Sequence, residues 1–466
     1  MRRAGAGVAA AVALALAGCA AVGPDYHRPN LDVPNAFAEA APASSALTAV
    51  PVDWWRLYQD PTLDELVARG LSQGTDVRLA VARVEEAAAL VREANATLFP
   101  EVDLSGNASR AGLSAQTPSV RGGALPTFNN FTLSANTAFE LDFWGRLRRL
   151  REAAQAQFEA SEYARGVVGL TLSGAIARTY FTLRALDAQI VVSQESLAAA
   201  NDSVAITRQR AAGGIASELD VYQAEGNRAQ LASQLKELQR LRAVALHQLA
   251  VLTNDLTLTL APADLRTIPA PPLPPPGLPS TLLERRPDLR QAEATLKAAN
   301  AQIGVARAQQ LPTISLTASL GLSSDNLAHL VSPGATIWSV GVGLLGPVID
   351  WGRYAARTAE SEARARQAAI AYEQAMQSAF RDVSDALSNV GYAAQTERDL
   401  AERVSFASNS LRLATQRYEA GYSAYLEVLD AQRTLNDAQL LLMRNRQLFL
   451  SYTVDLMNAL GGGWQA

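Results

Sequence analysis

The side chains that could do chemistry are few, and the most suggestive are two acids near the C-terminal end of the 466-residue chain. The stretch RYEAGYSAYLEVLDAQ, residues 417–432, contains Glu427 and Asp430. A spacing of three places both carboxylates on one face of a helix. Such a pair could attract cations, or it could be two solvated charges on a helix surface, and the local sequence leaves both interpretations open.

A second chemical feature is the only cysteine of the chain. The N-terminus MRRAGAGVAAAVALALAGCAAVGPDY has two arginines, a short apolar run and then the tetrapeptide LAGC, which ends at Cys19. This pattern matches the bacterial lipobox, so we predict a signal peptide at 1–18 and acylation of Cys19 with diacylglyceryl and N-acyl groups. Ala20 in the next position implies sorting to the outer membrane. The alternative is that Cys19 is only a small residue in an ordinary secretory leader.

Nothing else in the sequence indicates catalysis or a resident cofactor. His27, His247 and His329 lie far apart, none belongs to a metal-ligand spacing, and no glycine run has the phosphate-cradling pattern. The formal net charge of −4 becomes −6 when Arg2 and Arg3 leave with the signal peptide. We therefore expect no enzyme, no metal site and no nucleic-acid partner.

The acids belong to an internal repeat. Residues 210–225 read RAAGGIASELDVYQAE, and aligning Gly214 with Gly421 (421 minus 214, or 207) also aligns Asp220 with Glu427. The offset of 207 also relates Trp144-Gly145-Arg146 to Trp351-Gly352-Arg353, and an offset of 212 relates Asp76 to Asp288 and Phe99-Pro100 to Leu311-Pro312. We predict an N-terminal arm at 19–61, tandem repeats at 62–261 and 282–460, a proline-rich linker at 262–281 and a tail at 461–466.

Proline-free stretches predict the helices that carry these residues. There is no proline between Pro61 and Pro100, between Pro126 and Pro262, between Pro287 and Pro312, or after Pro347, and these stretches are rich in helix-forming residues. A helix from Gly145 to Gly214 would be about 100 Å long at 1.5 Å per residue. Leucine and isoleucine at three-to-four spacing in it fit coiled-coil packing. We expect each long helix to be one arm of a pair that turns at 213–214 or at 421.

Two segments, about 101–141 and 313–346, alternate between apolar and small polar residues instead. In TISLTASLGL, residues 313–322, every second side chain is apolar, and residues 338–344 and 131–139 follow the same pattern. Segments of about ten such residues suit tilted membrane-spanning strands with lipid on one side and water on the other. The alternative is the edge of a soluble sandwich. Four strands with one apolar face exposed are not a stable sheet, so we expect them to close with strands of other chains.

The mature chain resembles the TolC-like outer-membrane factors, in particular the NodT-type lipoprotein branch. The resemblance rests on DWWRLYQDPTLDELV at 53–67, LLERRPDLRQAEATLKAANAQIGVARAQQLPTISL at 282–316 and RYEAGYSAYLEVLDAQRTL at 417–435. It implies a fold that combines a transmembrane β-barrel with an α-helical barrel. In that fold, a homotrimer donates four strands per chain to one twelve-stranded barrel above a periplasmic coiled-coil tunnel of twelve helices.

The same resemblance assigns roles to the glycine turns. They become the periplasmic tip, where a periplasmic adaptor (membrane fusion protein) docks, and the matching positions are Arg210, Gly214, Leu219, Arg417, Gly421 and Leu426. Glu427 and Asp430 match inward-pointing gate acids that repeat three times around the pore axis, and Asp220 is their counterpart in the first repeat. Negative charge concentrated in a narrow pore would favour cations and could raise the affinity of the acids for protons.

The resulting functional prediction is an outer-membrane exit duct in a Gram-negative bacterium. It would conduct drugs or other small molecules passively from an inner-membrane pump of RND type, through the adaptor, to the exterior. Two alternatives are a type I protein-secretion conduit and a structural coiled-coil lipoprotein without a pore.

Overall fold

A computed structural model describes residues 21–30, 36–37, 50–112, 127–274, 282–462 and 464. The predicted signal peptide, Cys19 and parts of the arm, linker and tail lie outside these residues. The chain divides into two compact units: unit 1 comprises Met1–Asn30, Arg83–Ser161 and Ala292–Tyr372, and unit 2 comprises Leu31–Ala82, Glu162–Gln291 and Glu373–Ala466. Each unit takes segments from both predicted repeats.

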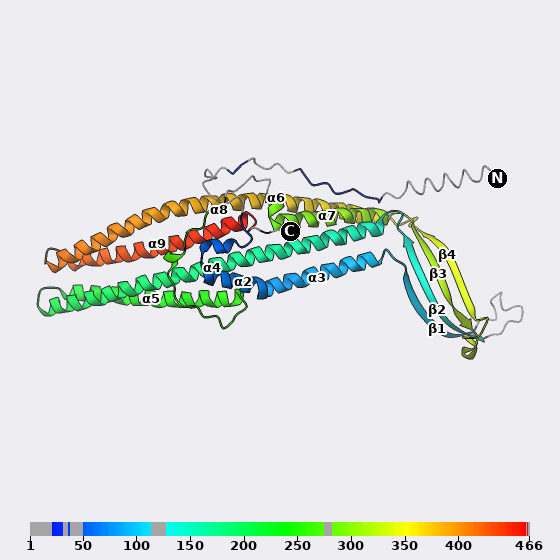
Figure 1. Ribbon diagram of the computed structural model, residues 1–466, viewed down its shortest axis with the longest axis horizontal. Coiled ribbons are helices and arrows are strands. Elements are labelled where there is room, and N and C mark those ends of the chain that lie inside the picture. The colour runs from blue at the N-terminus through cyan, green and yellow to red at the C-terminus, as the bar shows by residue number, and fades with distance from the viewer. Residues whose placement is uncertain are drawn as a thin grey trace. The chain divides into compact units, whose positions relative to one another are not determined.

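The helices are those that the proline-free stretches predict, with additional short ones (Figure 1). α4 (Arg146–Ala212) and α8 (Arg353–Glu419) each contain 67 residues, and α5 (Glu218–Leu252) and α9 (Tyr425–Ala459) each contain 35. The remaining helices are η1 (Trp54–Tyr58), α2 (Pro61–Gln73), α3 (Thr75–Ala96), η2 (Leu265–Thr267), α6 (Leu282–Arg285), α7 (Pro287–Ala308) and η4 (Leu327–His329). Within the described residues, none of these helices has both the length and the apolar composition required to cross a bilayer.

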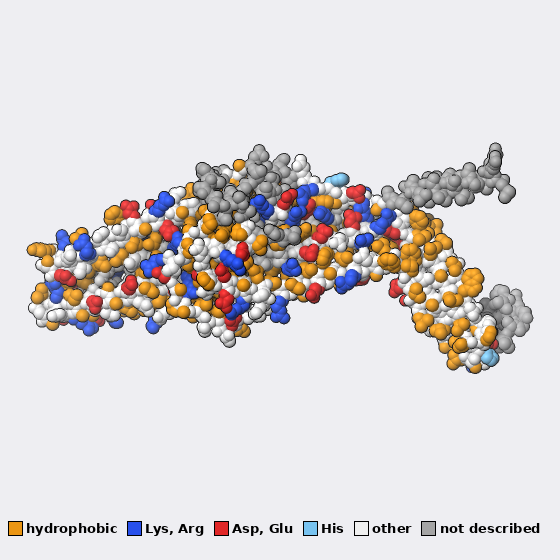
Figure 2. Space-filling view, in the orientation of Figure 1, with side chains coloured by type: hydrophobic (Ala, Val, Ile, Leu, Met, Phe, Trp, Pro, Cys, Tyr) orange, Lys and Arg blue, Asp and Glu red, His pale blue; other side chains and the backbone are white. Residues whose placement is uncertain are grey.

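Unit 1 contains a four-stranded antiparallel sheet in the order β1-β2-β3-β4, as the alternating segments predict. Its strands are β1 (Glu101–Gly112), β2 (Thr127–Leu141), β3 (Thr313–Ser324) and β4 (Thr336–Leu345). The register places apolar residues opposite one another, for example Leu133 with Leu322, and Leu316 with Val342. One face of β4 is therefore a row of exposed apolar side chains, namely Trp338, Val340, Val342 and Leu344. Figure 2 shows mainly hydrophobic and uncharged side chains over the strands.

A carboxylate caps the first turn of each long helix, just after the preceding strand ends. The Asp142 carboxylate accepts hydrogen bonds from the backbone N–H groups of Leu147 and Arg148, both at 2.9 Å, and Asp350 accepts one from Tyr354 N–H at 2.9 Å. These bonds satisfy amide donors that have no partner within the helix. The same kind of carboxylate cap is therefore present at the start of the long helix in both repeats.

Unit 2 is built around aromatic side chains from the region that the sequence assigned to the N-terminal arm. Trp54 and Tyr58 of η1 are fully buried. The Tyr58 hydroxyl lies 2.7 Å from the Thr453 hydroxyl of α9, and its ring packs against Phe181 of α4 with ring centroids 4.9 Å apart. A stretch between a leader and a helix carries no periodicity that would reveal this burial.

Unit 2 also fixes the beginning of the proline-rich linker. The Asp187 side chain is buried between Arg184 at 3.0 Å and Arg242 at 2.5 Å, and it accepts a hydrogen bond from the Ala263 N–H at 3.2 Å. Arg242 also donates to the Leu260 carbonyl at 2.9 Å. The buried carboxylate therefore ties the chain that leaves α5 to the middle of α4.

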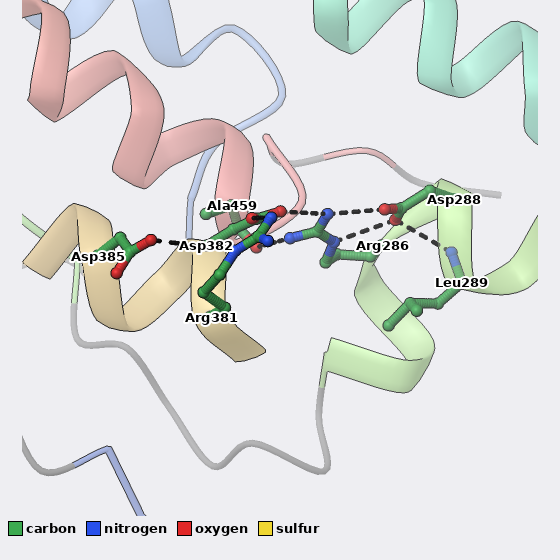
Figure 3. A network of polar contacts seen from close by, with 7 residues as sticks. All are labelled: Arg286, Asp288, Leu289, Arg381, Asp382, Asp385 and Ala459. Carbon is green, nitrogen blue, oxygen red and sulfur yellow. Dashed lines mark hydrogen bonds and ion pairs between the residues drawn. The ribbon is translucent and has the colours of Figure 1, made fainter. Parts of the chain in front are cut away.

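A second buried charge, Arg286 in the LLERRPDL motif, joins three helices of unit 2 (Figure 3). It contacts Asp288 of α7 at 2.6 Å and Asp382 of α8 at 3.3 Å, and it donates to the carbonyl of Ala459 in α9 at 3.2 Å. Burial alone would lower the Arg286 pKa, but the two carboxylates outweigh this effect and raise it. The guanidinium therefore remains charged in its buried position.

We expect Arg286→Ala to destabilise the protein by about 1.5–3 kcal/mol, because the substitution removes charge-assisted hydrogen bonds to the half-buried carboxylates of Asp288 and Asp382 and a buried one to the Ala459 carbonyl. Arg381 belongs to the same network, at 3.0 Å from Asp382, but its side chain is 66% exposed. Arg381→Ala is thus a matched control that should cost at most about 1 kcal/mol. Urea unfolding followed by circular dichroism measures both. Equal shifts in the two variants would contradict a special role for the buried arginine.

Candidate functional site

The glycine turns that join α4 to α5 and α8 to α9 have the same backbone construction. Gly214 has a φ of 71° and Gly421 a φ of 80°, left-handed values that suit a residue without a Cβ atom. The N–H of Ile215 donates to the Arg210 carbonyl and that of Tyr422 to the Arg417 carbonyl, both at 2.9 Å. This hydrogen-bond pattern closes a helix and reverses the chain. The positive φ values and these hydrogen bonds explain why the chain reverses at 213–214 and at 421.

The two turns contact each other through Arg210. Its guanidinium carbon lies 4.6 Å from the centre of the Tyr418 ring, and its Nη1 donates to the Glu419 carbonyl at 3.3 Å. Tyr418 in turn meets Tyr425 edge to face, with ring centroids 5.5 Å apart. Burial raises the pKa of both tyrosines. Arg210, which was predicted to contact an adaptor, thus also links the two repeats.

The structure gives the three predicted gate acids different surroundings. Glu427 Oε2 lies 3.4 Å from Arg417 Nε, and both side chains are more than half exposed. Asp430 is exposed one turn further along α9, and Asp220 is half-buried in the first turn of α5. Glu427 and Arg417, assigned to separate roles from the sequence, are therefore partners.

Exposed apolar side chains surround the two turns. Leu219 and Leu426, two of the predicted docking residues, are 61% and 58% exposed. Ile215, Tyr222 and Tyr422 are also largely exposed, and the sequence analysis did not single them out. The sequence signal that could have identified these residues is their position close to the turn glycines. Exposed apolar side chains that cluster in this way are available for contact with another molecule, and Figure 2 shows hydrophobic and charged side chains mixed at this end of unit 2.

Further along the helices from the glycine turns, polar side chains connect the two helical hairpins, α4–α5 and α8–α9. Gln432 Nε2 donates to Ser203 Oγ at 2.9 Å, and Arg433 Nε lies 3.4 Å from Asn227 Oδ1. A cavity of about 230 Å³ adjoins Asn227 and Gln432. The hairpins also share a buried apolar cluster at this level, which includes Val204, Ala224 and Val428, so polar and apolar contacts together hold them to each other. None of these polar residues stood out in the sequence.

The described residues contain no group of three or more His, Cys, Asp or Glu side chains arranged to hold a metal ion. The chemistry of the turns is therefore that of charge, aromatic contact and exposed apolar surface. Such a surface can bind a protein or attract cations, but it presents no nucleophile beside a base.

Comparison with known proteins gives this geometry a context. Residues 66–255 and 278–462 match the family model described as outer membrane efflux protein. The chain is 35% identical to the "probable efflux pump outer membrane protein TtgC" of Pseudomonas putida, over 98% of this chain and 95% of the relative. It is 32% identical to the "probable outer membrane lipoprotein SilC" of Salmonella typhimurium, over 96% of each chain.

A solved structure agrees with the sequence relatives. The outer membrane channel CmeC of Campylobacter jejuni superposes with a TM-score of 0.88 and 25% sequence identity, over 96% of each chain. The likeness therefore extends over the strands, the long helices and both glycine turns.

Proposed function

The chain belongs to the family of outer membrane efflux proteins, which are transport conduits and not enzymes, and we propose that it works as a homotrimeric exit duct. Efflux through the outer membrane follows from the family. The trimer, the twelve-stranded barrel, the lipid anchor and the specific partners are the proposal. The observation that carries it is a sheet of four strands with one apolar face and two unpaired edges.

Three chains would close this sheet into a barrel. Among the strands in the described residues, β1 and β4 each have a neighbour on one side only. An unpaired edge is costly in a bilayer because no water is present to satisfy its N–H and C=O groups. Twelve strands enclose a lumen wide enough for water, whereas the smallest barrels are filled by side chains.

The turn end of unit 2 would be the gate and the adaptor-binding surface. Leu219 and Leu426, together with the exposed residues beside them, supply apolar contacts for a periplasmic adaptor. Gly214 and Gly421 set the direction of the turns, and Arg210 and Arg417 add charge. Glu427, Asp430 and Asp220 would form the acidic constriction when three copies surround the axis.

Acylated Cys19 would anchor the chain in the outer membrane. In support, the relative SilC is named a lipoprotein. The arm that follows Cys19 is also well fixed within unit 1, because Arg28 makes two hydrogen bonds to the buried carboxylate of Glu293, at 2.8 and 2.7 Å. The lipid would therefore be held close to the protein rather than on a free tether.

The cargo would be drugs or other small molecules, delivered by an inner-membrane pump of RND type through the adaptor. The name of the relative TtgC, an efflux pump outer membrane protein, supports this choice over a type I protein-secretion conduit. A structural coiled-coil lipoprotein without a pore would not need the apolar-faced sheet.

The test is the conductance of the purified full-length trimer in planar bilayers. We expect single channels that pass small cations. Inserted trimers that never conduct would reject the duct and favour the structural lipoprotein. A conducting trimer that fails to restore drug resistance to an efflux-deficient strain expressing a matching pump and adaptor would instead point to the secretion conduit.

A further inference from the structure

The two repeats meet at a tryptophan contact at the base of the sheet. Trp144 follows β2, and its indole Nε1 donates to the carbonyl of Pro312 at 2.7 Å. Pro312 immediately precedes β3, the strand that pairs with β2. The contact thus fastens the end of one strand to the beginning of its neighbour.

The repeat contains the same two groups again, but at the outer edges of the sheet. An offset of 207 carries Trp144 to Trp351, which follows β4, and an offset of 212 carries Pro312 back to Pro100, which precedes β1. β4 and β1 are the strands with an unpaired edge. One chain therefore contains both halves of a second contact, too far apart in the strand order to meet each other.

Burial shows that these outer positions lack the neighbour that the inner ones have. Trp144 and Pro312 are half-buried, whereas Trp351 is 95% exposed and Pro100 is also exposed. Trp351 is in addition held at a φ of 53°, a left-handed conformation that costs a bulky residue about 1–2 kcal/mol. An exposed indole in a strained backbone gains on both counts if a partner lets it adopt the conformation of Trp144.

We infer that Trp351 of one copy donates its indole N–H to the Pro100 carbonyl of a second copy, and that this contact sets the register between β4 and β1. The inference rests on the proposed trimer and specifies its interface. The occupant of each open edge is then the opposite edge of an identical chain, which is a heterologous contact that closes into a ring.

The repeat offsets also give the register itself. Within one chain Ala138 of β2 pairs with Thr317 of β3. Adding 207 to 138 and subtracting 212 from 317 gives Leu345 of β4 opposite Ser105 of β1, and the next pair is Leu344 opposite Gly106.

The pleat supports this register independently. Leu344 pairs with Ile314 on the apolar face, and Gly106 pairs with Leu133 on the same face. A register shifted by one residue would turn the apolar set of β1 to the polar side.

Cysteine cross-linking in the membrane-inserted protein tests the register. We expect Ser105→Cys plus Leu345→Cys to give dimers and closed trimers on non-reducing gels, because directly opposite residues have Cβ atoms about 4.5–5.5 Å apart. The matched control is Ala138→Cys plus Thr317→Cys, a pair observed within one chain, which should cross-link without forming dimers. Single-cysteine variants control for the native Cys19.

The shifted pair Ser105→Cys plus Leu344→Cys provides the opposing result, since its side chains would lie on opposite faces. Cross-linking of this pair in preference to Ser105 with Leu345 overturns the register. A trimer that conducts but cross-links at neither pair, while the 138–317 control succeeds, also overturns it and leaves the duct intact. Absence of any trimer, measured by native mass spectrometry, rejects both.

The hydrogen bond has its own readout. Trp351→Phe keeps the ring but removes the indole donor, and it should lower the temperature at which the trimer dissociates in detergent. Trp144→Phe removes the equivalent bond inside one chain and should leave that temperature closer to the wild-type value. A Trp351→Phe trimer that dissociates at the wild-type temperature would refute the contact.

Discussion

Channels in which Glu427 and Asp430 are both replaced by alanine are expected to lose most of their block by trivalent cations. A unit charge 4 Å from a carboxylate gains about 1 kcal/mol even in water, and about 1.4 kcal/mol corresponds to a tenfold change in affinity. Removing six carboxylates from one constriction should thus weaken block by roughly tenfold or more. The substitution also releases Arg417 from its 3.4 Å pair with Glu427, which adds free positive charge at the same level.

The measurement is the half-blocking concentration of a trivalent cation in single-channel recordings at fixed ionic strength. Glu237→Ala is the control, because Glu237 is an exposed acid of α5 that already pairs with Arg240 at 2.6 Å. Unchanged block in the double variant, with normal conductance, would place the cation-binding constriction elsewhere and would make Glu427 and Asp430 ordinary surface charges.

The second large effect concerns the apolar face of β4. We expect Val340→Arg to reduce insertion into lipid vesicles severely, because an arginine facing lipid near the middle of a spanning strand costs about 2–4 kcal/mol. Val340 is 74% exposed and pairs with Ala318 on the apolar face. Three copies per barrel would multiply the penalty. Flotation of vesicles after refolding measures the inserted fraction.

Ser339→Arg is the matched control for this strand. Ser339 precedes Val340, pairs with Ser319 and points to the opposite face of the sheet. It should insert like the wild type, since an arginine in a water-filled lumen keeps its hydration. If Ser339→Arg fails and Val340→Arg inserts, the lipid and lumen faces are the reverse of those proposed.

Periodicity and punctuation in the sequence were sufficient to predict the long helices, the strands and the glycine turns, but not the short helices η1, η2 and η4. The gap between Pro126 and Pro262 contains α4 and α5, and the glycine inside it marks the turn, because proline excludes helix interiors and glycine accepts a positive φ. Alternation at 313–322 predicted β3, since successive side chains of a strand point to opposite faces. Because these signals depend only on residues close together in the chain, they can be read from a single sequence.

Contacts between distant residues were not accessible in the same way. The burial of Tyr58 depends on Phe181 of α4 and Thr453 of α9, which lie more than a hundred positions further along the chain. The cation–π contact between Arg210 and Tyr418 likewise joins residues of different repeats. The residues adjacent to these side chains in the sequence give no indication of the distant contacts.

The sequence by itself determined that this protein has two matching halves, with long helices, short amphipathic strands and glycine turns, because composition and spacing control backbone conformation locally. Only the tertiary structure decided which charges are buried, that Arg417 pairs with Glu427, and that Trp144 hydrogen-bonds the Pro312 carbonyl whereas Trp351 is 95% exposed. The reason is physical: the free energy of a side chain depends on what surrounds it, and identical motifs at the middle and the edge of a sheet have different surroundings.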